Sequence, residues 1–258
     1  MHTLILSFFL SLAHGSPLRV LIDPGHGGRD HGTEKNGVTE SSLVLNIAKQ
    51  LDQRLSQDKR FRPYLTRSND QLISLSNRAR MAKDLKADVF LSIHINSSPD
   101  ARAKGAEFYF QNQLPPDEES MLLAHMENNR EAGAEHPHVY EAIDSSLPSE
   151  ISAILTDLLD ADRIRRSSSL STALKVAWRG SKKSRANSVL QAPFFVLSQM
   201  ATPSTLVELG FITNTDDFRD LTSPASQGKM VEDLYRGLLR YLESTTTINH
   251  ATRQPTPQ

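Results

Sequence analysis

The sequence predicts a single α/β domain with a twisted, mostly parallel or mixed sheet of about six strands, helices on both faces and a helical insertion. Short apolar runs alternate with amphipathic helical patterns along the chain, which is typical of strands joined by crossover helices. A length of 258 residues is enough for one domain with a sizeable core, and no internal repeat divides it. One domain with an insertion is therefore the simplest interpretation.

The expected elements can be assigned in chain order. Leu18–Ile22 is an apolar strand that ends in a Gly/Pro turn, and Thr39 is a suitable N-cap for a helix with apolar positions from Val44 to Leu55. The other expected elements are a strand at Arg62–Thr66, a helix around Leu75–Leu85, strands at Val89–Ile93 and Ala106–Phe110, helices at Asp117–Arg130, Ser149–Asp160 and Leu170–Arg179, strands at Phe194–Leu197 and Thr205–Glu208, and a last helix around Val231–Leu242.

The domain boundaries follow from composition. Residues 1–15 combine an apolar run, too short to span a bilayer, with small residues at Ala13 and Gly15, which is typical of a signal peptide. The alternative is an ordinary buried segment at the start of the fold. Residues 16–243 form the main domain, residues 111–191 its insertion, and residues 244–258 a flexible, polar tail. No transmembrane segment is expected in the mature chain.

Composition narrows the chemistry. Lys and Arg number 29 against 30 Asp and Glu, so charge gives no reason to expect nucleic acid as a partner. The chain has no Cys, which excludes disulfides, thiolate nucleophiles and every Cys-ligated metal site. Any metal must therefore be held by His, Asp or Glu.

Four ionisable residues lie where an α/β sheet places its catalytic groups, at the carboxyl ends of strands and at the start of a helix. They are His26, Glu40, His94 and Glu208. Two imidazoles and one carboxylate form a catalytic zinc set, and a further carboxylate can carry the proton of an attacking water. Position alone leaves open which glutamate is the ligand and which is the base. Taken singly, each residue also has a purely structural interpretation, such as a helix-start acid for Glu40.

Four segments in order resemble the motifs of one family. They are VLIDPGHGGRDHGT (Val20–Thr33), the stretch around Glu40 in GVTESSLVLNIAKQL, YLTRSNDQLISLSNRARMAKDLKADVFLSIHINSS (Tyr64–Ser98) and TPSTLVELGFITN (Thr202–Asn214). The chain resembles the zinc-dependent N-acetylmuramoyl-L-alanine amidases of the amidase-3 family over about Leu18 to Leu242. The resemblance implies one Zn²⁺ per chain, with His26, Glu40 and His94 as ligands and Glu208 as the catalytic residue.

The resemblance also implies the reaction and its setting. The expected substrate is peptidoglycan, cleaved at the amide between N-acetylmuramic acid and L-alanine for cell separation and wall remodelling. The protein is expected to be a monomer exported to the periplasm, with an extracellular location as the alternative. Two alternatives to this function are a zinc exopeptidase and a non-catalytic peptidoglycan-binding regulator on the same fold.

Two further predictions concern residues around the site. Asn96 and Arg67 are candidates for binding substrate, although Arg67 could equally serve as a structural ion-pair partner and Asn96 could support the neighbouring His94. Division-type members of the family carry an insertion whose glutamate covers the zinc until an activator protein displaces it. Glu127 and Glu131 are the candidates for such an inhibitory plug, and the alternative is that both lie on a solvated helix face.

Overall fold

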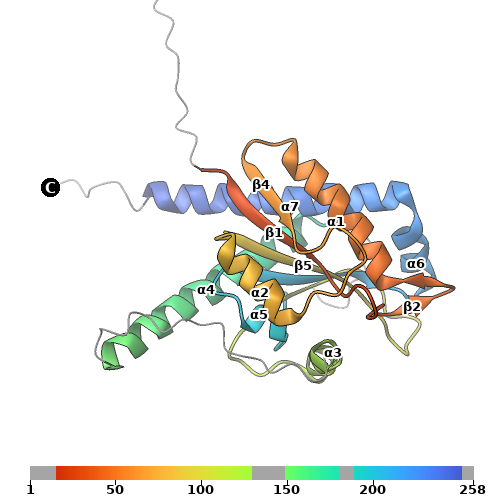
Figure 1. Ribbon diagram of the computed structural model, residues 1–258, viewed down its shortest axis with the longest axis horizontal. Helices are drawn as coiled ribbons and strands as arrows, with labels where there is room; N and C mark the ends of the chain where they lie inside the picture. The colour runs from red at the N-terminus through yellow and green to blue at the C-terminus, as the bar shows by residue number, and fades with distance from the viewer. Residues whose placement is uncertain (1–15, 130–148, 181–188, 252–258) are drawn as a thin grey trace, which may run out of the picture.

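The computed structural model describes residues 16–129, 149–180 and 189–251, with a six-stranded sheet at the centre (Figure 1). The strands are β1 (Leu18–Pro24), β4 (Phe61–Leu65), β5 (Val89–Asn96), β6 (Glu107–Phe110), β7 (Leu190–Gln191) and β8 (Ser204–Phe211), in the order β4-β1-β5-β8-β6-β7. β6 runs antiparallel to β8, whereas the other neighbouring pairs are parallel. The predicted mixed sheet is therefore confirmed. A separate two-stranded ribbon is formed by β2 (Glu34–Lys35) and β3 (Val38–Thr39).

Helices cover both faces of the sheet, as expected. One face packs against α1 (Glu40–Ser56), α4 (Ser149–Ala177) and α7 (Pro224–Ala251), and the other lies under α2 (Leu75–Asp84), α3 (Glu118–Asn129) and α5 (Phe195–Ser198). The remaining helix, α6 (Thr215–Thr222), follows β8. Every residue of β5 and of β8 is buried, because both strands are central and covered on both sides.

The ends of the parallel strands and the start of α1 meet at one edge of the sheet. The α1 helix begins where expected, because the Thr39 side chain accepts a hydrogen bond from the backbone of Ser42. Its buried residues recur at helical spacing and fix the helix against the sheet: Glu40, Ser41, Leu43, Val44, Ile47, Ala48, Leu51 and Leu55. This packing sets the position of Glu40, the first residue of the helix.

Three expectations about elements were wrong. The apolar run Phe194–Leu197 is the short helix α5 rather than a strand, and its backbone bonds link Ser198 N to Phe194 O. A short apolar run has no period that separates the two structures. The expected helices Ser149–Asp160 and Leu170–Arg179 are parts of one helix, α4, because no Gly or Pro interrupts it. The last helix continues to Ala251, so much of the expected tail 244–258 is helical.

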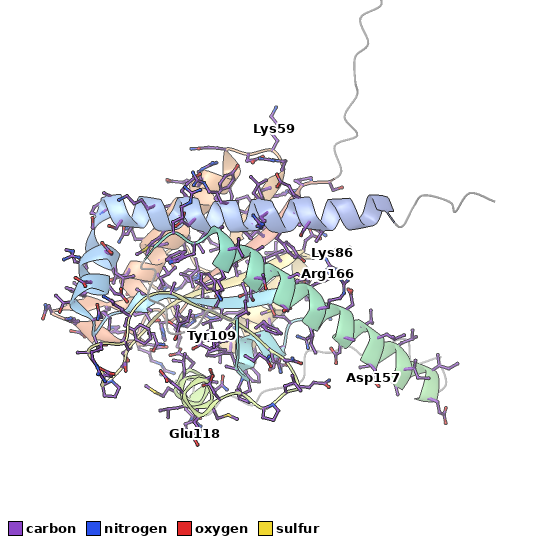
Figure 2. The ribbon with its side chains drawn as sticks, turned by 180° about the vertical axis from the view of Figure 1, so that it is seen from behind. Lys59, Lys86, Tyr109, Glu118, Asp157 and Arg166 are labelled. Atoms are coloured by element: carbon purple, nitrogen blue, oxygen red, sulfur yellow. The ribbon has the colours of Figure 1, made fainter. Side chains whose placement is uncertain are left out.

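The two halves of α4 differ in their surroundings. The second half packs against the sheet and α7 through Leu170 and Leu174, and its buried Ser167 and Ser171 hydrogen-bond to Ser204 and Thr205 of β8. The first half, which contains Asp157, projects from the body of the molecule (Figure 2). It exposes a row of apolar side chains: Ile151, Ile154, Leu155, Leu158 and Leu159. None of the helices in the described part of the chain is long and apolar enough to cross a membrane.

Candidate metal centre

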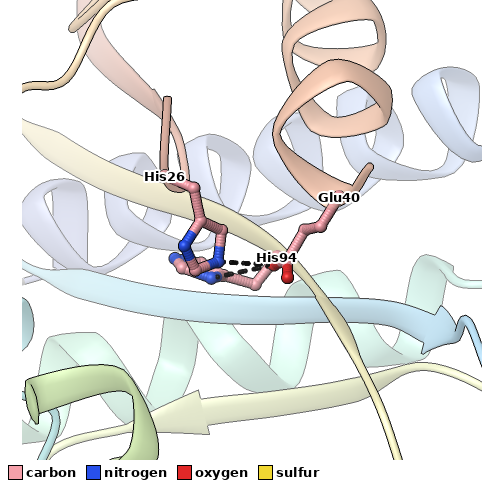
Figure 3. A group of neighbouring side chains, drawn as sticks. All are labelled: His26, Glu40 and His94. Carbon is pink, nitrogen blue, oxygen red and sulfur yellow. Dashed lines mark ion pairs between the residues drawn. The ribbon is translucent and has the colours of Figure 1, made fainter. Parts of the chain in front are cut away.

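Three of the four predicted site residues converge at the catalytic edge of the sheet (Figure 3). His26 follows β1, Glu40 begins α1 and His94 lies near the end of β5, and one potential ligand atom from each lies within 4.8 Å of the others. The Oε1 atom of Glu40 is 2.9 Å from Nε2 of His26 and 3.2 Å from Nδ1 of His94. All three side chains are buried. The structure thus brings Glu40, rather than Glu208, into the group with the two histidines.

The donor atoms of this cluster fit a metal ion. His26 Nε2 and His94 Nδ1 are buried and face the Glu40 carboxylate, but no hydrogen bond of good geometry satisfies either nitrogen among the described residues. The Nδ1 atom of His26 lies 2.8 Å from Oδ2 of Asp30, so this carboxylate can hold the proton on Nδ1 and leave the Nε2 lone pair directed at the cluster. Two imidazole nitrogens and one carboxylate oxygen are a typical ligand set for a catalytic zinc ion.

Glu40 is held firmly in its position. Its Oε1 atom accepts a hydrogen bond of 2.9 Å from the backbone of Ile95, and its Oε2 atom accepts one of 2.9 Å from the backbone of Thr33. Burial opposes the ionisation of Glu40. The neighbouring His26 and His94 favour it, however, and hold the pKa of Glu40 well below its usual value. The carboxylate is therefore ionised, as a metal ligand must be.

The loop that carries His26 has a strained backbone. His26 has φ 58°, and the following Gly27 and Gly28 have φ 125° and 61°. Two buried arginines hold this loop: Arg67 donates to the carbonyls of Pro24, Gly25 and Ser41, and Arg78 donates to those of Pro24 and His26. Arg78 also pairs with the buried Asp23. These contacts position His26 before any ligand binds.

The same contacts bear on the predicted substrate-binding residues. Arg67 is almost fully buried, and its guanidinium donates to four backbone carbonyls. Asn96 is also buried, with its amide donating to Glu107 and accepting from the backbone of Ser97. The geometry favours positioning roles for both residues, and a direct contact with substrate stays a prediction.

Glu208 lies beside the cluster on β8. It is the register partner of His94 on β5, is buried, and its Oε2 atom has no hydrogen-bond partner among the described residues. Burial raises the pKa of Glu208 well above its usual value, and the carboxylates of Glu40, Glu127 and Glu107 raise it further. A carboxylate with an elevated pKa is suited to accept and return a proton near neutral pH.

The insertion brings a second carboxylate to the two histidines of the cluster. Oε2 of Glu127, on α3, is 3.6 Å from Nε2 of His26 and 3.5 Å from Nδ1 of His94, so it faces the same atoms as Glu40. The next residue, Asn128, ties α3 to the start of α5: its amide donates to Pro193 O at 3.0 Å and accepts from Phe195 N at 2.7 Å. The alternative that Glu127 lies on a solvated face does not hold, whereas Glu131 lies outside the described residues.

Sequence reasoning missed three residues of this region. Asp30 could have been found, since it follows His26 by four residues in the same Gly-rich turn. Glu107 and Asn128 gave no local signal, because their roles depend on β6 and α5 lying beside other parts of the chain.

A buried His/Glu/His cluster with a further buried carboxylate, at the carboxyl edge of an α/β sheet, is typical of metal-dependent hydrolases. The comparisons with known proteins narrow this class. Residues 20–240 match the model of the amidase-3 family, described as N-acetylmuramoyl-L-alanine amidase, and the chain belongs to this family. The expectation from the sequence motifs is thereby confirmed.

Individual relatives agree with this assignment. The N-acetylmuramoyl-L-alanine amidase AmiA of Salmonella typhimurium is 32% identical over 228 residues, which cover 88% of this chain and 77% of the relative. The solved amidase AmiC2 of Nostoc punctiforme is 26% identical, with a TM-score of 0.62 over 89% of this chain and 99% of that one. The catalytic domain of CwlV from Paenibacillus polymyxa, at 21% identity and a TM-score of 0.63 over 88% of this chain and 98% of that one, has the same fold.

Proposed function

We propose that this protein is a zinc-dependent amidase that hydrolyses the bond between the lactyl group of N-acetylmuramic acid and L-alanine in peptidoglycan. The observation that carries the proposal is the convergence of His26, Glu40 and His94, with Glu208 buried on the adjacent strand. Family membership supports the substrate class. The function would serve cell separation and wall remodelling.

In this proposal His26, Glu40 and His94 hold one Zn²⁺. The ion, when bound, polarises the scissile carbonyl and makes a nearby water more acidic. Glu208 takes the proton from the attacking water and returns it to the leaving nitrogen of L-alanine. Its burial and its acidic neighbours suit it to this exchange, because they favour the protonated state that forms halfway through the reaction.

The proposal includes self-inhibition by the insertion. The carboxylate of Glu127 faces the same imidazole nitrogens as Glu40 and would compete with water and substrate for the open position on the ion. An activator protein that pulls α3 away would remove this block. Because such a switch needs two arrangements of α3, the contacts of this helix decide how much enzyme is active at rest.

We further propose that residues 1–15 direct export, that the mature enzyme works as a monomer in the periplasm, and that residues 111–191 form the regulatory insertion of the catalytic domain 16–243. The short apolar run followed by Ala13 and Gly15 supports export. The position of α3 over the metal cluster supports the regulatory role of the insertion.

The test compares the wild-type chain, from Ser16 onward, with Glu208→Gln. Wild-type protein should contain about one zinc, release stem peptides from purified peptidoglycan and lose activity with a chelator. Glu208→Gln should keep its zinc but lose activity by roughly 10²- to 10⁴-fold, because it removes the proton acceptor and leaves the ligands.

The matched control is Glu232→Gln on α7, which covers the face of the sheet opposite to α3 and α5. Glu232 pairs there with Arg54. It should retain full activity. Full activity in Glu208→Gln would contradict the proposed base. Release of terminal amino acids instead of whole stem peptides would favour a zinc exopeptidase, and zinc binding without any hydrolysis would favour a non-catalytic regulator.

A further inference from the structure

A second buried acidic residue, Glu107, is the first residue of β6 and lies opposite Glu208 of β8. Glu107 is only 5% exposed. Its Oε2 atom accepts two hydrogen bonds, one of 3.0 Å from the amide of Asn96 and one of 3.0 Å from the hydroxyl of Tyr109, which lies in the interior in Figure 2. These two donors come from β5, on the far side of β8, and from β6 itself, so the carboxylate of Glu107 is fixed in place.

The strand register puts Glu107 directly beside Glu208. In the antiparallel pair of β6 and β8, Glu107 is the partner of Glu208, and opposed residues of such a pair project from the same face of the sheet. On its other side, Glu208 is paired with His94 of β5. The side chain of Glu208 therefore lies between a histidine of the metal cluster and a second carboxylate.

The hydrogen bonding of the two acids differs. Donors aimed at a carboxylate favour its ionised form, so the Asn96 and Tyr109 contacts favour a negative charge on Glu107. Glu208, by contrast, has a buried Oε2 atom without a hydrogen-bond partner in the described part of the chain. With no donor on this oxygen, the direction of the Glu208 carboxylate depends strongly on the charges around it.

We propose that Glu107 is a positioning residue, whose fixed negative charge directs the Glu208 carboxylate away from β6 and toward the His26–Glu40–His94 cluster. Glu107 touches neither the metal ligands' donor atoms nor the substrate in this role, and acts through Glu208. The inference rests on the proposed function, because it assigns a support to the proposed base. The same charge contributes to the raised pKa of Glu208, which agrees with the paired positions of the two residues on β6 and β8.

The test separates charge from shape by two substitutions at one position. Glu107→Gln keeps the size and an acceptor for Asn96 and Tyr109 but removes the charge, and it adds an amide that can bind the Glu208 carboxylate. Glu107→Asp keeps the charge on a shorter side chain. We expect kcat to fall about tenfold in Glu107→Gln and at most about threefold in Glu107→Asp, with KM within about twofold of wild type in both.

Two measurements that do not depend on activity accompany the kinetics. The zinc affinity of Glu107→Gln should match that of wild type, because Glu107 is not in the ligand cluster. The metal-free variant should unfold at the same temperature as wild type or higher, since one of several converging negative charges is removed. Tyr109→Phe, which removes one donor but leaves the charge, should lower kcat less than Glu107→Gln.

The outcomes distinguish this inference from the function itself. All variants are assayed beside wild type, and again with Glu127→Ala so that self-inhibition does not limit the signal. An inactive wild type would overturn the proposed amidase activity. An active wild type with Glu107→Gln as active as Glu107→Asp, or more active, would overturn the positioning role alone. A loss of kcat in Glu107→Gln that comes with a markedly lower unfolding temperature would also overturn it, because that pattern indicates a structural residue.

Discussion

Two helices bring a carboxylate to the same pair of histidines, and they are anchored very differently. Glu40 begins α1, which buries eight residues, and its two oxygens accept backbone hydrogen bonds from Ile95 and Thr33. Glu127 lies on α3, of which only Ser120 and Ala124 are buried. Oε2 of Glu127 lies 3.6 Å from Nε2 of His26 and 3.5 Å from Nδ1 of His94. The corresponding distances from Oε1 of Glu40 are 2.9 and 3.2 Å.

The difference in anchoring agrees with the two different roles proposed for these acids. A carboxylate on a helix fixed by apolar packing is a permanent part of the site, because moving it would expose several core side chains at about 1.5–3 kcal/mol each. A carboxylate on a lightly packed helix can leave at a much smaller cost. The same substitution in the two acids should therefore have opposite consequences.

The largest effect is expected from Glu40→Gln. Loss of the charged ligand should lower zinc affinity by at least about 100-fold and abolish peptidoglycan hydrolysis, because the two histidines then lose their carboxylate partner. Competition with a coloured chelator measures the affinity. Unchanged zinc affinity in Glu40→Gln would remove Glu40 from the ligand set.

Glu127→Gln should act in the opposite direction. Basal hydrolysis should rise on the order of tenfold, as expected if about one molecule in ten has α3 displaced at rest, while zinc affinity is kept. Dye release from labelled peptidoglycan, without any activator, measures this rate. The control is Glu118→Gln in the first turn of the same helix, which is exposed and should change nothing. Equal rates in Glu127→Gln and wild type would argue against self-inhibition.

A smaller rise is expected from Asn128→Ala. This change removes the two hydrogen bonds that tie α3 to α5. A net loss of about 1 kcal/mol shifts the equilibrium of α3 roughly fivefold, and from a displaced fraction of about one in ten this raises the rate about three- to fourfold. Asn129→Ala, at the neighbouring position on α3, is the matched control, since the Asn129 amide contacts His125 of the same helix and not α5 in the described part of the chain. Asn128→Ala should add nothing in a Glu127→Gln background. An additive effect would mean that Asn128 acts on something other than the plug.

The smallest effect concerns the pH dependence of the metal-free protein. Burial lowers the pKa of His26, but the carboxylates of Glu40, Asp30 and Glu127 outweigh it and raise the pKa from 6.5 to about 10. A raised pKa in the folded state stabilises the fold fully below pH 6.5, and this contribution is lost as pH rises through about 10. The unfolding temperature of chelated protein should therefore fall by a few degrees between about pH 7 and pH 10.

Zinc-loaded protein is the comparison for this last experiment. The ion replaces the proton on His26, so the decline with pH should be weaker when zinc is bound. An unfolding temperature of the chelated protein that stays constant or increases over this range would contradict the charged state assigned to His26.

The parts of the site that the sequence predicted are those fixed by regular geometry. His94 and Glu208 lie near the ends of adjacent parallel strands, and Thr39 caps the helix that begins with Glu40, so their convergence follows from strand direction and one N-cap. The family motifs predict Glu40 as the ligand and Glu208 as the base, a choice that residue spacing alone leaves open.

The parts that could not be predicted depend on contacts between distant segments. Whether Phe194–Leu197 forms a strand or a helix is decided by packing between α2 and α3 rather than by a local period. Glu208, which is paired with Glu107, and Phe195, which bonds to Asn128, lie far from these residues in the sequence, with no fixed spacing. The exposure of the first half of α4 could not be predicted either, because the sequence of Ser149–Asp160 indicates a helix but not what covers its apolar residues.

The backbone at His26 limits how the metal preference of this enzyme could be redesigned. His26 adopts a left-handed conformation, which few residues other than glycine, asparagine and aspartate accept readily, whereas His94 lies in the strand β5. Exchanging the ligand at His26 would alter the course of the chain as well as the donor atom. A redesign for cobalt or iron chemistry should therefore begin with His94 on β5 and keep His26 and its turn unchanged.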